Sequence, residues 1–116
     1  MVALSHETAL AVYGISDANP SAIHVTVPKS ARLRRESPKS VAVHHDDLSS
    51  QEITVIEGLP VTSIARTITD LLHSGGRLDL ISQAITDARR EGYISAAETQ
   101  RIRRALKSHV EGLRAS

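Results

Sequence analysis

The sequence predicts an α+β fold, in which a short helix and a small mixed or antiparallel β-sheet are followed by three helices packed on the sheet. Apolar and polar residues alternate with period two in the first half of the chain, as in half-buried strands, whereas apolar residues recur at helical spacing in the second half. Strands and helices do not alternate regularly, which argues against a parallel α/β fold. The length of 116 residues is that of one domain.

The first half of the chain supplies one helix and three strands. Ser5 can cap a helix over about 6–13, and Gly14 is placed to end it. The alternating stretches predict three strands and a shorter extended piece, which cover residues 23–27, 41–45, 53–56 and 59–61. The polar and basic stretch 29–40 predicts a loop or a hairpin arm.

The second half supplies three helices. Thr62 or Ser63 can cap the first, whose apolar stripe comprises Ile64, Ile68, Leu71 and Leu72. The next covers about 77–91, and the last about 96–110, after the capping-box pair Ser95 and Glu98. The compact connection between these two helices is compatible with a helix-turn-helix motif across 77–108 and equally with a plain helical hairpin.

Composition excludes several classes of function. The chain has two tyrosines and no other aromatic residue, so it lacks the rings that RNA-recognition and single-strand-binding surfaces use for stacking. It has no cysteine, which excludes disulfides, iron–sulfur clusters and a thiol nucleophile. The N-terminus resembles no signal peptide, and no apolar run is long enough to span a bilayer, so we expect a cytoplasmic protein without membrane contact.

Charge is nearly balanced overall, at +1, but is segregated along the chain. Two basic stretches, 29–39 and 89–107, flank the acidic stretch 46–57. Basic side chains can contact DNA phosphates, although a solvated loop and a solvated helix surface have the same signature. The residues that we expect to contact DNA are Lys29, Arg32, Arg34, Arg35, Lys39, Arg101 and Arg104.

The segment His44–Asp47 is the most metal-like cluster. On a strand, His44 and Asp46 share a face, and His24 is a candidate third ligand. Adjacent strand residues point to opposite faces, however, so the four cannot chelate one ion together. We therefore expect a polar strand end, with neither a metal site nor a cofactor.

Enzymatic motifs are also missing. None of the three lysines follows an acidic residue at the spacing of a restriction-type nuclease, and the chain has neither a Walker loop nor a Gly-x-Ser-x-Gly elbow. We therefore predict that the chain is not an enzyme and has no catalytic residues. Arg66 and Asp70 lie at i, i+4 on one predicted helix, and we interpret them as a structural ion pair.

The segment Gly58–Leu72, GLPVTSIARTITDLL, resembles the signature of the AbiEi-type antitoxin and transcriptional-regulator family of type IV toxin–antitoxin systems. Upstream, the segments ALSHETAL, IHVTVP and VHH are similar to motifs of that family, and so is the downstream region 83–95. The resemblance covers about 3–110 in a single domain. Members usually begin with a winged-helix domain, which we do not expect in this chain.

The resemblance implies a bacterial antitoxin that represses its own operon and opposes a nucleotidyltransferase-like toxin without a stable complex with it. Promoter DNA and a second copy of the chain are the implied partners. Two alternatives remain: a catalytically inactive, nuclease-related domain that binds nucleic acid, and a dimerisation module of a DNA-binding regulator.

Overall fold

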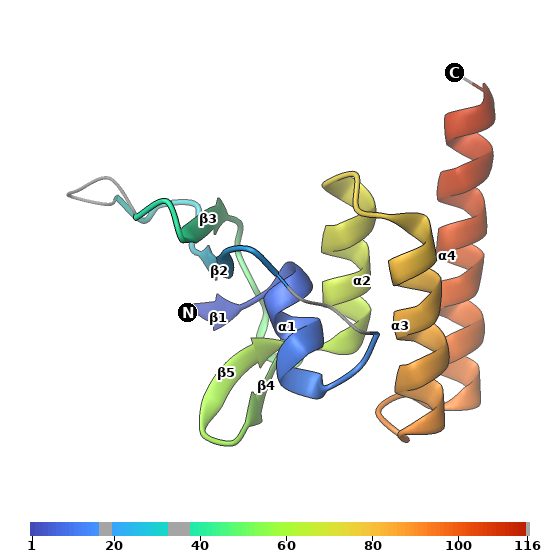
Figure 1. Cartoon of the computed structure of the whole chain (residues 1–116), viewed down its shortest axis with the longest axis horizontal. Helices are drawn as coiled ribbons and strands as arrows, with labels where there is room; N and C mark the ends of the chain where they lie inside the picture. Colours follow the sequence, from blue (N-terminus) through green and yellow to red (C-terminus); the bar gives the residue numbers. More distant parts are fainter. Residues whose placement is uncertain (17–19, 33–37, 116) are drawn as a thin grey trace.

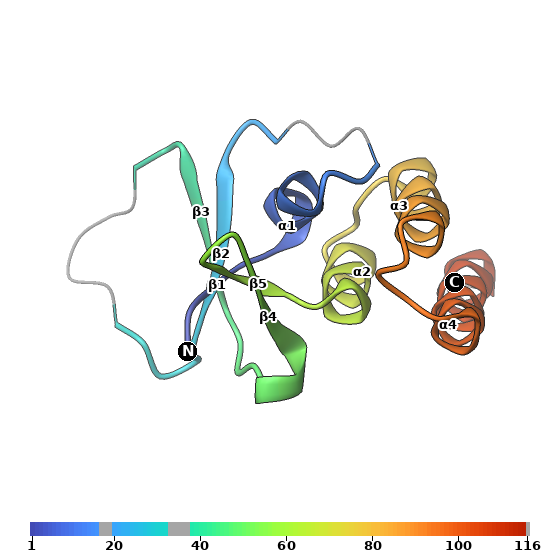
Figure 2. The same cartoon turned by 90° about the horizontal axis from the view of Figure 1, so that it is seen from below.

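The computed structural model describes residues 1–16, 20–32 and 38–115 of the chain. Its strands are β1 (Ala3–Leu4), β2 (Ile23–Val27), β3 (Val41–His45), β4 (Ile53–Ile56) and β5 (Leu59–Thr62). Its helices are α1 (His6–Tyr13), α2 (Ile64–His73), α3 (Leu78–Arg90) and α4 (Ala96–Ala115), with a 3-10 turn, η1, over Ser50–Glu52. The predicted α+β class is confirmed: α1 and α2 lie beside the sheet, and α3 and α4 lie beyond α2 (Figures 1 and 2).

The sheet is mixed and has the strand order β3-β2-β1-β5-β4. Its centre is the two-residue strand β1, which pairs antiparallel with β2 and parallel with β5. The sequence did not predict β1, because two residues carry no periodicity. The pairing on both sides stabilises β1 and joins the two halves of the sheet.

Strands β2 and β3 pair in parallel, from Ile23 opposite Val41 to Val27 opposite His45. The prediction that residues 29–40 form a hairpin arm is therefore wrong, and the alternative of a loop stays a prediction because residues 33–37 lie outside the described residues. A tight hairpin reverses the chain and can only join antiparallel strands, whereas a parallel pair needs a crossover of about a dozen residues or more. The connection after Val27 has that length.

The starts of α2 and α4 follow the predicted capping residues, whereas Ser5 makes no side-chain capping hydrogen bond at the start of α1. The Ser63 hydroxyl accepts a hydrogen bond from the backbone N–H of Arg66 at 3.2 Å, which caps α2. Before α4, Ser95 Oγ accepts from the backbone N–H of Glu98 at 3.1 Å, and Glu98 Oε1 accepts from the N–H of Ser95 at 3.2 Å. The predicted capping box is confirmed.

Helices α2, α3 and α4 form the second half of the fold. Helices α3 and α4 lie side by side and antiparallel (Figures 1 and 2), as in a helical hairpin and unlike the crossed helices of a helix-turn-helix motif. Helix α4 runs to Ala115 instead of ending near residue 110, and its last turns extend past the core, with 58% of Leu113 exposed. No helix of the described part is both long and apolar enough to cross a membrane.

The core lies between the sheet and the helices. Its most completely buried large aliphatic side chains come from α1, β5, α2 and α3, and they are Leu10, Val61, Ile68, Ile81 and Ile85. Tyr13 closes one end of this core, where its hydroxyl donates a hydrogen bond to the carbonyl oxygen of Thr62 at 2.9 Å. The core therefore fixes α2 against the sheet, and the polar groups of the candidate site lie along this junction.

Candidate functional site

The basic stretch after β2 is exposed but partly neutralised. Lys29, Arg32 and Lys39 are exposed, whereas Arg34 and Arg35 lie outside the described residues. The ammonium group of Lys29 lies 3.7 Å from a carboxylate oxygen of Asp46, and the backbone N–H of Lys29 donates to Asp47. Part of the predicted charge excess is therefore balanced by the neighbouring acidic loop.

The basic residues of α4 form a separate surface. Arg103, Arg104 and Lys107 line one shallow hollow together with Gln100, and all four side chains are exposed. Arg101 instead borders the groove between α2 and α4. Within the described chain, no carboxylate pairs with the basic side chains of α4. We call Gln100, Arg103, Arg104 and Lys107 the α4 face.

The two basic stretches do not form one surface. Helix α4 lies at one end of the molecule, and the described residues that flank the β2–β3 connection lie at the opposite end (Figures 1 and 2). The sheet, α1 and α2 separate them. The expected DNA-contacting residues are therefore divided between two surfaces.

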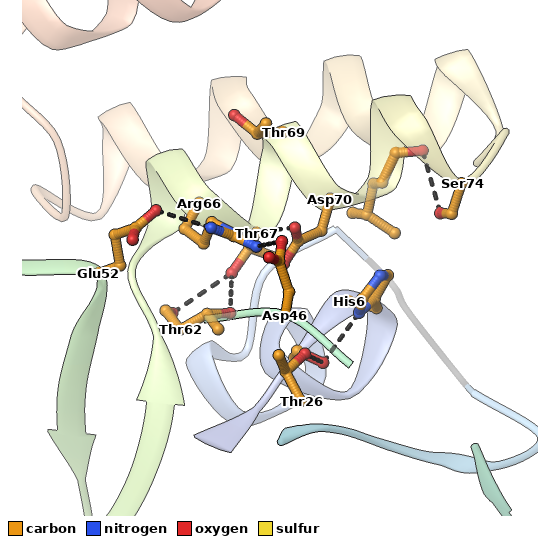
Figure 3. Close-up of polar contacts among 12 residues, drawn as sticks. His6, Thr26, Asp46, Glu52, Thr62, Arg66, Thr67, Thr69, Asp70 and Ser74 are labelled. Carbon is orange, nitrogen blue, oxygen red and sulfur yellow. Dashed lines mark hydrogen bonds and ion pairs between the residues drawn. The ribbon is translucent and has the colours of Figure 1, made fainter. Parts of the chain in front are cut away.

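Arg66 lies at the centre of a polar network between α2 and the sheet (Figure 3). Its Nε donates to Asp70 Oδ1 at 2.9 Å, so the structure brings the predicted pair together. Its Nη1 donates to Glu52 Oε2 at 2.9 Å, and its Nη2 pairs with Asp46. Only 13% of the Arg66 side chain is exposed. One guanidinium thus links three carboxylates from η1, α2 and the loop after β3.

The surroundings shift the pKa values of the three carboxylates in this network in different directions. The hydrogen bond from Arg66 lowers the pKa of Asp46, and the backbone N–H of Ser49, followed by Arg66, lowers the pKa of Glu52. Burial raises the pKa of Asp70 despite its ion pair. Burial alone would lower the pKa of Arg66, but hydrogen bonds to Glu52 and Asp70 outweigh it and raise the pKa. The Asp70 Oδ2 atom is buried and has no hydrogen-bond partner among the described residues.

Three histidines form a second cluster beside this network. The rings of His6 and His44 are stacked, with centroids 3.7 Å apart, and His24 Nδ1 lies 2.9 Å from His44 Nε2. Strand register explains part of this arrangement, because His24 and His44 lie on the same face of the parallel pair β2–β3. His6, the first residue of α1, joins the cluster from the helix and stacks on His44.

Polar neighbours fix the ring of His6. Its Nδ1 lies 2.8 Å from Ser5 Oγ, which in turn accepts a hydrogen bond from Thr26 Oγ1 at 2.8 Å. Burial, followed by the charges of the neighbouring His44, His24 and Arg66, lowers the pKa of His6 to about 4. Burial also lowers the pKa of His44. Both rings are therefore neutral at pH 7, and each has a nitrogen lone pair.

One pocket joins the two clusters. It has a volume of about 270 Å³, and its lining residues are His6, Thr26, His44, His45, Asp46, Arg66, Asp70, His73 and Ser74. Both neutral imidazoles and charged groups therefore border the same solvent-accessible space.

Sequence reasoning missed most of these contacts. It paired Arg66 with Asp70, four positions away, but did not connect Arg66 with Asp46 or Glu52, which lie 20 and 14 positions from it. It considered His24 as a candidate metal ligand together with His44, but it did not consider His6. The register of β2 and β3 is the signal that could have found the contact between His24 and His44. The alternative of a hairpin arm between the two strands obscured this register. No protein-family model and no curated protein sequence matches this chain.

Proposed function

We propose that this chain is the antitoxin-type regulatory domain of a type IV toxin–antitoxin system and that it contacts promoter DNA through the α4 face. The observation that supports DNA contact is the α4 face itself, where three basic side chains are exposed and have no carboxylate partner within the described residues. Such side chains bind phosphates, which positions a protein on DNA without reading bases.

The α4 face is a better DNA-contacting surface than the stretch after β2. Lys29 forms an ion pair with Asp46, which lowers the net positive charge of that stretch. Helix α4 has 20 residues and is therefore about 30 Å long, which allows it to follow several successive phosphates. We assign the main phosphate contacts to Arg104 and Lys107, because Arg103 also donates a hydrogen bond to Thr86.

The antitoxin role rests on the resemblance of the segment Gly58–Leu72 to the AbiEi-type family. In this proposal the domain opposes a nucleotidyltransferase-like toxin without binding it stably. The α4 face contributes affinity for promoter DNA through phosphate contacts.

A second candidate is a dimerisation module of a DNA-binding regulator. It is favoured by the apolar side of the last turns of α4, where Leu106 and Val110 are half-buried and Leu113 is exposed. If this side forms a homodimer, Leu113→Glu should shift the molar mass measured by light scattering from dimer to monomer. A wild-type chain that is already monomeric at high concentration would reject this candidate.

Repression and growth rescue in cells test the proposal. The chain should repress a reporter driven by the promoter of its own operon and should restore growth when a nucleotidyltransferase-like toxin is co-expressed. Arg104→Ala/Lys107→Ala should relieve repression, whereas Arg32→Ala/Lys39→Ala, which removes the same charge from the opposite end, should not. A wild-type chain that neither represses nor restores growth contradicts the proposal.

A further inference from the structure

We propose that His6, His24 and His44 form a binding site for a divalent transition-metal ion such as Zn²⁺. The three rings come from α1, β2 and β3, and one ring nitrogen of each lies within 4.8 Å of those of the other two. This site lies at the sheet, away from the α4 face, and does not depend on the proposed function.

The three histidine rings need only a small local movement to bind one ion. Zinc–nitrogen bonds of about 2.0–2.1 Å place two tetrahedral ligand atoms about 3.3 Å apart. His24 Nδ1 and His44 Nε2 are already 2.9 Å apart, so an ion can take the place of the proton that these two atoms share. The rings of His6 and His44 lie face to face, and one of them must turn about its side-chain bonds to aim its lone pair at the same ion.

The backbone of His6 carries an independent signal. His6 has a φ of 54°, in the left-handed region that a non-glycine residue rarely adopts. Such a conformation is strained, and strained residues concentrate at functional sites. In this conformation His6 begins α1 and its ring lies against His44, so a strained residue completes the cluster.

A second layer of hydrogen bonds supports His6. A histidine ligand usually donates its other ring N–H to a nearby acceptor, which fixes the tautomer and the ring orientation. Ser5 Oγ lies 2.8 Å from His6 Nδ1 and accepts a hydrogen bond from Thr26 Oγ1. This contact leaves His6 Nε2 as the atom that binds the ion.

The three imidazole nitrogens determine which metal ions the site favours. Imidazole nitrogens favour zinc, copper, nickel and cobalt, whereas magnesium and calcium prefer oxygen ligands. Three protein ligands leave a coordination position open for water or a substrate group. His6 and His44 border the same pocket as Asp70, whose buried Oδ2 atom lacks a hydrogen-bond partner among the described residues and can accept one from a bound water.

Charge around the pocket also favours a cation. The carboxylates of Asp46 and Asp70 line it together with Arg66, and Glu52 lies on the far side of that guanidinium. The three carboxylates therefore outnumber the two cations beside them, which are Arg66 and the Lys29 ammonium group near Asp46. An anion is disfavoured at this place.

Metal titration of the full chain tests the site. With Co²⁺ as the probe, visible absorption should saturate at one ion per chain, and Zn²⁺ should displace the Co²⁺. His24→Gln should weaken binding at least tenfold. The matched control is His109→Ala, because His109 lies on α4, does not border the pocket beside the cluster and should not contribute.

A second measurement needs no variant at the site. In NMR spectra of the wild-type chain, one equivalent of Zn²⁺ should shift the ring signals of His6, His24 and His44 and leave that of His109 in place. This result supports the site even if His24→Gln fails to fold. The proposal is overturned if one equivalent of ion shifts none of the three rings, or if the His109→Ala variant loses binding.

Discussion

Arg66 and Glu52 are joined by a hydrogen bond of 2.9 Å although they lie 14 positions apart and belong to different elements. The same guanidinium binds Asp46 after β3 and Asp70 on its own helix. A single side chain thus connects α2 to two segments that flank the sheet. This connection holds α2 beside the sheet at the pocket that we propose as a metal site.

Replacement of Arg66 should destabilise the fold strongly. Arg66→Ala leaves three carboxylates close together with only the exposed Lys29 near Asp46, and the Asp70 carboxylate is largely buried. Removing one partner of a buried ion pair costs about 3–5 kcal/mol, and partial exposure of Asp46 and Glu52 reduces this cost, so we expect a loss of about 2–3 kcal/mol. Urea denaturation measures the free energy of unfolding.

The control for Arg66 is an arginine whose ion pair is exposed. Arg77 binds Asp79 at 2.6 Å, and both side chains are mostly exposed. Exposed pairs contribute little, so Arg77→Ala should leave the unfolding curve nearly unchanged. If Arg66→Ala unfolds at the same urea concentration as Arg77→Ala, the network does not stabilise the fold.

Asp87 makes stability depend on acid pH. Its carboxylate is buried and accepts hydrogen bonds from the backbone N–H of Ser16 at 2.7 Å and from the Gln83 amide at 2.8 Å. The Ser16 N–H, followed by Gln83 and Arg90, lowers the pKa of Asp87 in the folded state. At pH 7 we therefore expect Asp87→Asn to lose about 1–3 kcal/mol, the range for hydrogen bonds to a charged group.

The pH dependence has a defined sign. Because the folded-state pKa is lower than the unfolded-state value of about 4, the contribution of the carboxylate is complete above that value and is lost as the pH falls through the folded-state pKa. The difference in unfolding free energy between the wild type and Asp87→Asn should therefore shrink below about pH 4. A difference that stays constant from neutral to acid pH contradicts this account.

Tyr13 should ionise at unusually high pH. Burial, followed by the neighbouring Tyr93, raises the pKa of Tyr13 to about 12. Since the chain has no other aromatic residue, tyrosinate absorbance in an alkaline titration reports these two groups alone. The variant Tyr13→Phe should lose the component that titrates near pH 12. If the component that it loses titrates near the ordinary value of about 10 instead, the core does not hold the hydroxyl.

Local patterns predicted the elements better than their assembly. Strand 23–27 and the capping box of Ser95 and Glu98 were predicted because neighbouring residues determine them. Strand β1 and the parallel pairing of β2 with β3 depend on distant partners, which periodicity does not encode. The hairpin alternative was wrong because it assumed that the segment between β2 and β3 joins two antiparallel neighbours.

The same distinction applies to the candidate site. The contact between Arg66 and Asp70 follows from helical spacing, so it could be predicted. The contacts of Arg66 with Glu52, and of His6 with His44, join elements whose placement depends on the core and on strand order. Only the assembled sheet brings these side chains together.

The salt dependence of DNA binding is the most direct test of the central claim. We would measure binding of the chain to a duplex from its own operon promoter over a series of salt concentrations. Removing two phosphate contacts should make the slope of log K against log salt less steep by about two. We predict this change for Arg104→Ala/Lys107→Ala and a wild-type slope for Arg32→Ala/Lys39→Ala. A wild-type slope for the α4 variant would contradict DNA contact through the α4 face.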